Sequence, residues 1–483
     1  MATPVDAAPA LLAGHRLLED ELGPYLQLRK QLQSHATKNR ELESYYESSQ
    51  KVRQLDIAIP PHLKDLMVAA GWGGTAIDVI EERLNWSEFV SAGDLMGLDE
   101  IYVDNDLDVE APLAQLDALI SGVSFVTVGT GDADKDEPPI LVTAESPADC
   151  TTLWDYRRRM SVAALSRTVG PTGRVDMETL YLPDKTISLE RGRDGRMEVV
   201  DRDDHEKGRV PVSRLVNRAR TSRKGGRSEL TRAVRYYVDA AIRTLLGMEV
   251  NREFYTTPQR WLMGADMSVF QDEEGKMADA WAAVAGLMLA MPRPFDKDTE
   301  QWGELPQVGQ FAAAPPTPYI DQVRAYSMLL AAEVGIPASY LGYATDNPAS
   351  ADAIRAGQDR LINRSLRRQR GFTQGWRDVA YNALLWRDGR VDVDKLKQVA
   401  PDWTNPATPT PQAAADEATK LIGAGVLLPD SEVTYKRVGL TPIERAQLRS
   451  EKRRAAARQM VSDLAAANSN VIDLAARRRG QQG

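Results

Sequence analysis

The chain contains 483 residues, of which 43% are hydrophobic and 27% are charged, with a single cysteine and a formal net charge of −9 at pH 7. This length is too great for one compact core and predicts two to four domains, and the lone cysteine excludes a disulfide framework and a cysteine-rich zinc site. The acidic balance argues against a general nucleic-acid coat, because such binding depends on neutralisation of phosphates by Lys and Arg.

Hydropathy and histidine spacing argue against a membrane span, a signal peptide and a metal site. No apolar run reaches the roughly 18 residues that a membrane span needs, so no span and no membrane partner are predicted. Asp6, Glu19 and Asp20 interrupt any apolar run near the start, so no signal peptide is predicted and we expect synthesis in the cytosol. The histidines are scattered at no ligand spacing, so we expect no metal site.

The N-terminal part, up to about residue 225, predicts a mixed α+β region. Apolar residues recur at helical spacing in "LLEDELGPYLQLRKQL" and again in "TAIDVIEERL". Strand-like runs follow at residues 119–131 and 139–155 and within "METLYLPDKTISLER", separated by Gly and Asp turns.

A basic segment closes this region. Residues 210–227 hold no acidic residue and carry Arg214, Arg218, Arg220, Arg223, Lys224 and Arg227. The segment lacks interleaved aromatic residues and its flanks are acidic, so a solvated loop or a subunit contact is favoured over a patch that binds DNA.

Two helices with an irregular segment between them come next. "GRSELTRAVRYYVDAAIRTLLGMEVNREF" predicts a long helix that Ser228 would cap and Pro258 would stop. Residues 265–316 show poor periodicity, and "AAAPPTP" marks a boundary before the second helix, "YIDQVRAYSMLLAAEVGI", which should end at Ile336-Pro337.

The stretch "TDNPASADAIRAGQDRL" predicts the start of a much longer helix. Asn347 suits the N-cap and Pro348 the first helical position, and a helix from there to Asp388 would span roughly 60 Å at about 1.5 Å per residue. One narrow buried stripe is expected along it, formed by Ile354, Leu361, Phe372, Trp376 and Val379. The glycines at 357, 371 and 375 are expected weak points where the helix could bend or break.

Arg360, Arg364 and Arg367 fall on one face of this predicted helix. A solvated face or ion pairs between subunits is favoured there over a surface for a polyanion. Beyond the helix, "TNPATPTP" predicts a linker, followed by a small helical part and a basic tail that we expect to be disordered.

Motifs for catalysis or cofactor binding are missing from the sequence. It contains no G-x-x-x-x-G-K-[ST], H-E-x-x-H or G-x-S-x-G pattern. The glycine-rich "GWGGT" at residues 71–75 lacks the lysine of a phosphate loop, Asp203-Asp204 is interpreted as a solvated turn, and Cys150 as an inert thiol. We therefore expect no catalytic residue, no cofactor and no enzymatic activity.

Several motifs in a fixed order resemble the portal proteins of tailed phages, in particular the SPP1-type group of siphophages that is common in actinobacterial phages. They are "YYES", "IPPHLKDLMVAAGWGGTAIDVIEERL", "IYVDNDLD", "ALISGVSFVTVG", "GRSELTRAVRYYVDAAIRTLLGMEVNREFYTTPQRWLMG" and "AAEVGIPASYLGYATDNPASADAIRAGQDRL". Together they cover most of residues 40–390.

The resemblance implies an α+β, mainly helical portal fold with wing, stem, clip and crown regions, assembled as a ring around a central channel. By position, the N-terminal arm and wing are expected at residues 1–225, the stem helices at 226–263 and 318–336, the clip at 264–317 and the tunnel loop at 337–350. The long wing-to-crown helix is expected at 351–390, the crown at 391–470 and the basic disordered tail at 471–483.

The resemblance also implies a function and partners. The ring, a dodecamer in family capsids, would occupy one vertex of the virion and would pass double-stranded DNA during packaging and ejection, after assembly in the host cytoplasm. Expected partners are the major capsid protein, the terminase large subunit, a head–tail connector or adaptor, and a scaffolding protein. The alternatives are another virion structural or head–tail adaptor protein and a nucleotide-using packaging enzyme.

Two groups of site residues are predicted on this basis. The tunnel loop and channel constriction would consist of Tyr343, Ala344, Thr345, Asp346 and Asn347. Residues that face DNA or a neighbouring subunit would include Arg232, Arg235, Arg243, Arg360, Arg364 and Arg367.

Overall fold

A computed structural model describes residues 17–52, 68–256, 260–263, 295–296, 300–305, 307–310, 312, 315–342, 351–407 and 411–480. The chain forms two compact units, Met1–Thr404 and Asn405–Gly483. Their boundary falls at the start of the predicted Pro/Thr linker. A search of the helices in the described ranges finds none with the length and apolar character of a membrane span.

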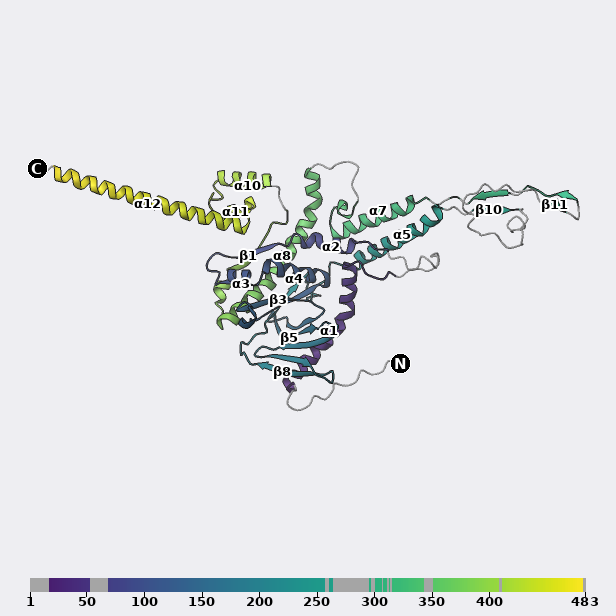
Figure 1. Cartoon of the computed structure of the whole chain (residues 1–483), viewed down its shortest axis with the longest axis horizontal. Coiled ribbons are helices and arrows are strands. Elements are labelled where there is room, and N and C mark those ends of the chain that lie inside the picture. The colour runs from purple at the N-terminus through teal and green to yellow at the C-terminus, as the bar shows by residue number, and fades with distance from the viewer. Residues whose placement is uncertain are drawn as a thin grey trace. The chain divides into compact units, whose positions relative to one another are not determined.

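A five-stranded antiparallel sheet lies under the first helix of the chain. Its strands are β4 (Cys150–Asp155), β5 (Met160–Val169), β6 (Val175–Tyr181), β7 (Thr186–Arg191) and β8 (Met197–Asp203), in sequential order. Helix α1 (Glu19–Tyr46) packs on one face of this sheet, where Leu28 and Leu32 meet Leu165 and Leu180 in one apolar core (Figure 1).

A second, three-stranded sheet has the order β3-β2-β9, with β2 at Val123–Thr130, β3 at Ile140–Glu145 and β9 at Val212–Val216. One face meets the five-stranded sheet through Phe125, Cys150 and Val212. The opposite face is covered by α4 (Leu107–Ser121) and α8 (Ala351–Asp388), whose apolar residues share one core with Val126 and Leu215. The sheet therefore has one free edge at β3 and another at β9.

Helix α8 is the predicted long helix and spans 38 residues. Leu361, Phe372, Trp376 and Val379 are buried, which confirms the narrow apolar stripe for these four positions. The side chain of Ile354, like the whole of Asn347 and Pro348, lies outside the described residues.

The glycines of α8 do not interrupt it, so the prediction of a break was wrong. The helix continues through residues 357, 371 and 375. A Cβ atom at Gly375 would lie 2.6 Å from the carbonyl oxygen of Arg214, whereas one at Gly357 would meet nothing within 4 Å. Gly375 therefore allows the helix to approach the backbone of β9 closely, and the helix continues through this point without a break.

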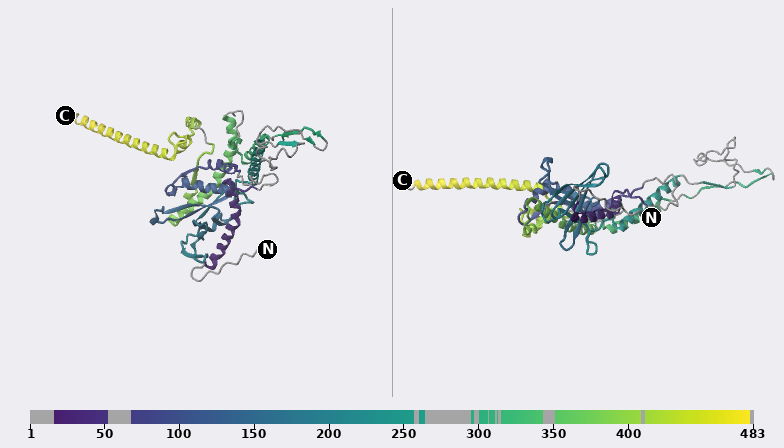
Figure 2. Two further views of the ribbon diagram at one scale, coloured as in Figure 1. Left: turned by 45° about the vertical axis from the view of Figure 1, so that its right-hand side comes forward. Right: turned by 90° about the horizontal axis from the view of Figure 1, so that it is seen from below.

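Helices α5 (Arg232–Thr256) and α7 (Thr317–Val334) run antiparallel and side by side away from the sheets (Figures 1 and 2). At the sheet end, Thr231 Oγ1 donates a hydrogen bond to Glu333 Oε1 at 3.2 Å. At the far end, β10 (Arg260–Met263) pairs with β13 (Gln307–Gln310), and β11 (Phe295–Asp296) pairs with β12 (Gln301–Trp302). Most of the expected clip lies outside the described residues.

The start of α5 differs from its prediction. The helix begins at Arg232, and Thr231 Oγ1 accepts the backbone N–H of Val234 at 3.3 Å, so Thr231 and not Ser228 is the cap. Ser228 Oγ instead accepts the N–H of Leu230 at 2.9 Å within a turn. In the same turn, the N–H of Glu229 donates to the carbonyl oxygen of Leu119 at 2.9 Å, which holds the turn against the end of α4.

The region after α8 also differs from its prediction. Residues 391–404 were expected to begin the crown, but β14 (Val399–Trp403) returns to pair with β1 (Trp86–Ser91) in the first unit. Helix α9 (Val393–Leu396) leads into it, and α2 (Trp72–Glu81) and α3 (Leu98–Asp104) also belong to this unit. Short 3₁₀ turns lie at Ala133–Lys135 and Ala338–Leu341.

The second unit contains α10 (Pro411–Gly423), α11 (Glu432–Val438) and α12 (Pro442–Gly480). The expected disordered tail from residue 471 is instead helical as far as Gly480. Alanine has a high helix propensity, and the sequence of this stretch contains Ala475 and Ala476.

Candidate functional site

The predicted tunnel loop lies outside the described residues. The structure describes the chain up to Gly342, which has a left-handed backbone conformation with φ of 89°, and resumes at Ala351. Tyr343, Ala344, Thr345, Asp346 and Asn347 therefore stay a prediction.

The three predicted arginines of α5 have different surroundings. Arg232 is exposed at the first position of the helix. Arg235 pairs with Glu41 of α1, and its guanidinium lies 5.7 Å from the ring centre of Tyr45. Arg243 is half-buried. Burial raises the pKa of the nearby Asp239, and the positive charges of Arg243 and Arg235 oppose this rise. Arg235 is thus engaged within its own subunit.

Arg360 and Arg364 of α8 both reach the C-terminal end of α7. Arg360 Nη1 donates to the carbonyl oxygen of Ala332 at 2.7 Å. Arg364 Nη1 donates to the carbonyl oxygen of Glu333 at 2.9 Å and also to that of Val334. The last carbonyls of a helix lack intrahelical partners and carry the negative end of its dipole, so the two guanidinium groups satisfy and stabilise this end. Two of the predicted site residues therefore fix α7 to α8.

Glu229, in the turn before α5, is the centre of a buried charge network that the sequence did not indicate. Its carboxylate accepts from Arg368 Nε at 3.0 Å, from Arg364 Nη2 at 3.1 Å and from Arg218 Nη1 at 3.1 Å. Burial raises the pKa of this carboxyl, but the three guanidinium groups outweigh it and hold the pKa below its ordinary value. The carboxylate is thereby ionised and links β9, α5 and α8.

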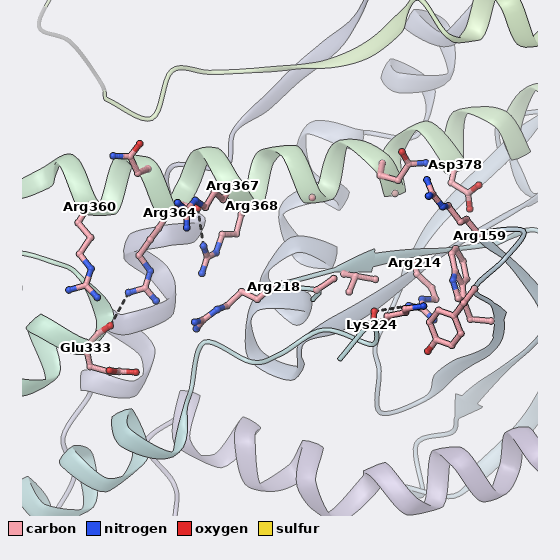
Figure 3. A pocket seen from close by; sticks show the side chains of 18 residues that line it. Arg159, Arg214, Arg218, Lys224, Glu333, Arg360, Arg364, Arg367, Arg368 and Asp378 are labelled. Atoms are coloured by element: carbon pink, nitrogen blue, oxygen red, sulfur yellow. Dashed lines mark hydrogen bonds between the residues drawn. The ribbon is translucent and has the colours of Figure 1, made fainter. Parts of the chain in front are cut away.

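Above this network, a groove of about 1460 Å³ follows the side of α8 beside β9 (Figure 3). Two carboxylates, Glu333 and Asp378, line it, together with eight cationic side chains: Arg159, Arg214, Arg218, Lys224, Arg360, Arg364, Arg367 and Arg368. Asp378 pairs with Arg209, and the exposed Arg367 borders the opening. We call this surface the basic groove.

Aromatic residues line the basic groove as well, although none occurs in the basic sequence segment itself. The guanidinium of Arg214 lies 4.3 Å from the ring centre of Trp154, and Lys224 Nζ lies 4.8 Å from that of Tyr156. Both rings come from the end of β4 and the turn after it, so only the folded chain brings them to the basic segment. Cation–π contacts of this kind hold the two cations in place.

The described residues contain no group of three or more His, Cys, Asp or Glu side chains that could hold a metal ion. Cys150 is fully buried, and burial raises the pKa of its thiol. The "GWGGT" segment begins α2, where a Cβ at Gly73 would collide with the carbonyl oxygen of Tyr45, so this glycine serves helix packing. The basic groove presents mainly cationic side chains, drawn from α8, β9 and the segments beside β9.

Comparison with known proteins shows the family of the chain. Residues 27–439 match the family model described as phage portal protein, SPP1 Gp6-like. The chain therefore belongs to the SPP1 Gp6-like family of phage portal proteins, which are structural components of the virion.

Individual relatives lie within the same family. The chain is 31% identical over 418 residues to the portal protein of Mycobacterium phage D29 and equally to that of Mycobacterium phage L5, with 84% of this chain and 83% of each relative covered. Among solved structures it is similar to a chain described as the neck of a native GTA particle computed with C12 symmetry. That chain is 16% identical, with a TM-score of 0.40, and the match covers 82% of this chain and 98% of the other.

Proposed function

We propose that this portal protein is the subunit of a closed ring, dodecameric in the assembled capsid, that forms the channel for packaging and ejection of double-stranded DNA. Membership in the portal family carries the proposal. The antiparallel pair α5 and α7 supports it, because two helices that extend together from a sheet-based body can be repeated around an axis to form a channel wall (Figure 1).

The charge of the chain suits a conduit through which DNA must slide. Each phosphate that a protein neutralises adds affinity and salt dependence, so a wall with few basic contacts favours movement. The net charge of −9 keeps such contacts few, and Arg232 and Arg243 on α5 are the candidates that offset the repulsion locally. Arg235, Arg360 and Arg364 are less suited to contact DNA, because their guanidinium groups are held by contacts within the subunit.

The segment from Tyr343 to Asn347 would form the narrowest part of the channel, with Asp346 presenting negative charge to the DNA. It joins the end of the α7 segment to the start of α8, so copies around a ring would converge at the axis. The expected clip at residues 264–317 would contact the terminase large subunit and later the head–tail connector. The body would contact the major capsid protein and the scaffolding protein during assembly in the host cytoplasm. No catalytic step is assigned to the chain.

A complementation experiment tests this function. In infected cells that lack the chain, we expect capsids without nuclease-protected DNA, and a plasmid copy of the full chain should restore filled capsids. The purified chain should not hydrolyse ATP by itself. Filled capsids formed in the absence of the chain, or robust ATP hydrolysis by the pure protein, would contradict the proposal.

A further inference from the structure

Within the described residues, several cations of the basic groove form no ion pair with a carboxylate. Glu229 compensates part of the charge of Arg218, Arg364 and Arg368 beneath the groove. Arg159, Arg214, Lys224, Arg360 and Arg367 also line it, and none of these five forms an ion pair with a carboxylate in the described part of the chain. The groove follows α8 from Arg360 to Asp378, which corresponds to about 27 Å at about 1.5 Å per residue. A surface of this length and charge fits an acidic protein element.

A surface of the opposite charge lies on α3 and the start of α4. Every charged residue from Leu84 to Asp134 is acidic. Five exposed carboxylates on α3 and the start of α4 define what we call the acidic face: Asp99, Glu100, Asp104, Asp106 and Asp108. Large apolar side chains are exposed among them, with Val103 70% and Val109 60% accessible. Exposed apolar residues within a charged rim are typical of a surface that another protein covers.

The two surfaces lie at opposite edges of the three-stranded sheet. Asn105, between α3 and α4, donates to the carbonyl of Ile140 at 2.9 Å and accepts the N–H of Val142 at 2.7 Å, which fixes the acidic face to the edge strand β3. Arg214 and Val216 of the other edge strand, β9, line the basic groove. The subunit is therefore positive beside one edge and negative beside the other.

We propose that the acidic face of one copy of the chain docks into the basic groove of the next copy around the ring. This inference rests on the proposed ring. Two different surfaces that complement each other form a head-to-tail interface, which closes into a ring when the rotation between copies allows it. The exposed Asp104 and Asp108 would approach Arg367 and Lys224, and Val103 would be covered in the same contact.

A nucleic acid fits the groove less well than a second copy does. Glu333 and Asp378 are part of its wall and would repel phosphates. A nucleic acid would also leave the acidic face and its exposed apolar side chains uncovered. Binding of DNA in the groove is therefore kept as one outcome of the test.

Charge reversal with a matched swap tests the interface in the full-length chain. Arg367→Glu with Lys224→Glu reverses groove cations that form no ion pair among the described residues, and Asp104→Lys with Asp108→Lys reverses the acidic face. Each pair should raise the protein concentration for half-maximal ring assembly by about tenfold or more, because like charges then face each other. Combining all four changes in one chain should restore much of the assembly. Arg193→Glu and Asp134→Lys, both at exposed turns elsewhere, are the controls.

Cross-linking provides a second readout that tolerates moderate loss of assembly. Cys150 is fully buried, so the native chain gives no background with a bismaleimide. Asp108→Cys combined with Arg367→Cys should yield a ladder of linked oligomers, while Asp134→Cys with Arg367→Cys should not.

The outcomes separate this inference from the proposed function. If all charge variants form rings at the same protein concentration as the wild type, and no cross-linked ladder exceeds that of the control, the interface lies elsewhere. That result would overturn this inference but not the proposed ring. Groove variants that assemble normally but lose DNA binding would assign the groove to nucleic acid instead. A wild-type chain that remains monomeric at every protein concentration would overturn both the ring and the interface.

Discussion

Arg368 donates from Nε to Oε1 of Glu229 at 3.0 Å, and both side chains are buried. Because Arg364 and Arg218 reach the other carboxylate oxygen, this one acid joins α8, the end of β9 and the turn that starts α5. Arg364 also holds the last carbonyls of α7. The two extended helices are thus anchored to the body through one charge network, and several consequences of that arrangement can be measured.

Replacing Glu229 by Gln should destabilise the first unit strongly. The change leaves buried guanidinium groups without their counter-charge, which typically costs roughly 3–5 kcal/mol in the free energy of unfolding. Chemical unfolding followed by tryptophan fluorescence measures the loss. Glu190→Gln, at an exposed position on β7, is the control and should cost little. A loss of less than about 1 kcal/mol for Glu229→Gln would show that the network contributes little to stability.

The acid sensitivity of the first unit should depend on the same carboxyl. Its pKa in the folded state lies below the ordinary value of 4.5. The stabilisation is therefore fully present above the ordinary pKa and is lost as the pH falls through the lower, folded-state pKa. Glu229→Gln removes this titration, so the free energy of unfolding of the variant should fall less steeply below pH 4.5 than that of the wild type. Parallel curves for the two proteins would contradict the assignment.

Two glycines of α8 should respond in opposite directions to alanine. At Gly375 the new Cβ would lie 2.6 Å from the carbonyl oxygen of Arg214, a backbone atom that cannot move without disturbing β9, so Gly375→Ala should destabilise the protein. At Gly357 nothing lies within 4 Å, so Gly357→Ala should stabilise the helix by about 0.5–1 kcal/mol. Thermal unfolding midpoints of the two variants decide this. Equal shifts would show that α8 does not depend on close contact at Gly375.

Cys150 should react with thiol reagents only when the protein unfolds. The side chain is fully buried between the sheets, and burial raises the pKa of the thiol, so the reactive thiolate is scarce as well as inaccessible. Labelling with an uncharged maleimide at pH 7.5, followed by mass spectrometry, should give unmodified native protein and complete modification in denaturant. Rapid labelling of the native protein would mean that the space between the sheets opens.

Local patterns in the sequence were sufficient to predict most of the helices and strands described in the first unit. Strand-like runs bounded by Gly and Asp turns predicted β2, β6 and β7. Helical patterns predicted α5, α7 and the buried stripe of α8 from Leu361 to Val379. The pairing of β1 with β14 could not be predicted, because Trp86 and Trp403 belong to segments that no local pattern connects. The register of such a pair depends on packing between distant parts of the chain.

The same limit applies to the basic groove and to Glu229. The sequence showed two basic segments, but their aromatic neighbours Trp154 and Tyr156 come from a different strand. Glu229 resembled an ordinary first-turn acid beside Ser228, and only the fold brings Arg364 and Arg368 to it. The long run without Lys or Arg around Asp104 is visible in the sequence, but no local pattern connects it to the basic residues of the groove.

Cryo-electron microscopy of the purified full-length chain tests the central claim most directly. The account predicts closed rings with an open central channel, in which α5 and α7 form the wall and the segment from Tyr343 to Asn347 forms the narrowest point. A protein that remains monomeric at every concentration, or that forms particles without an open central channel, would contradict the account.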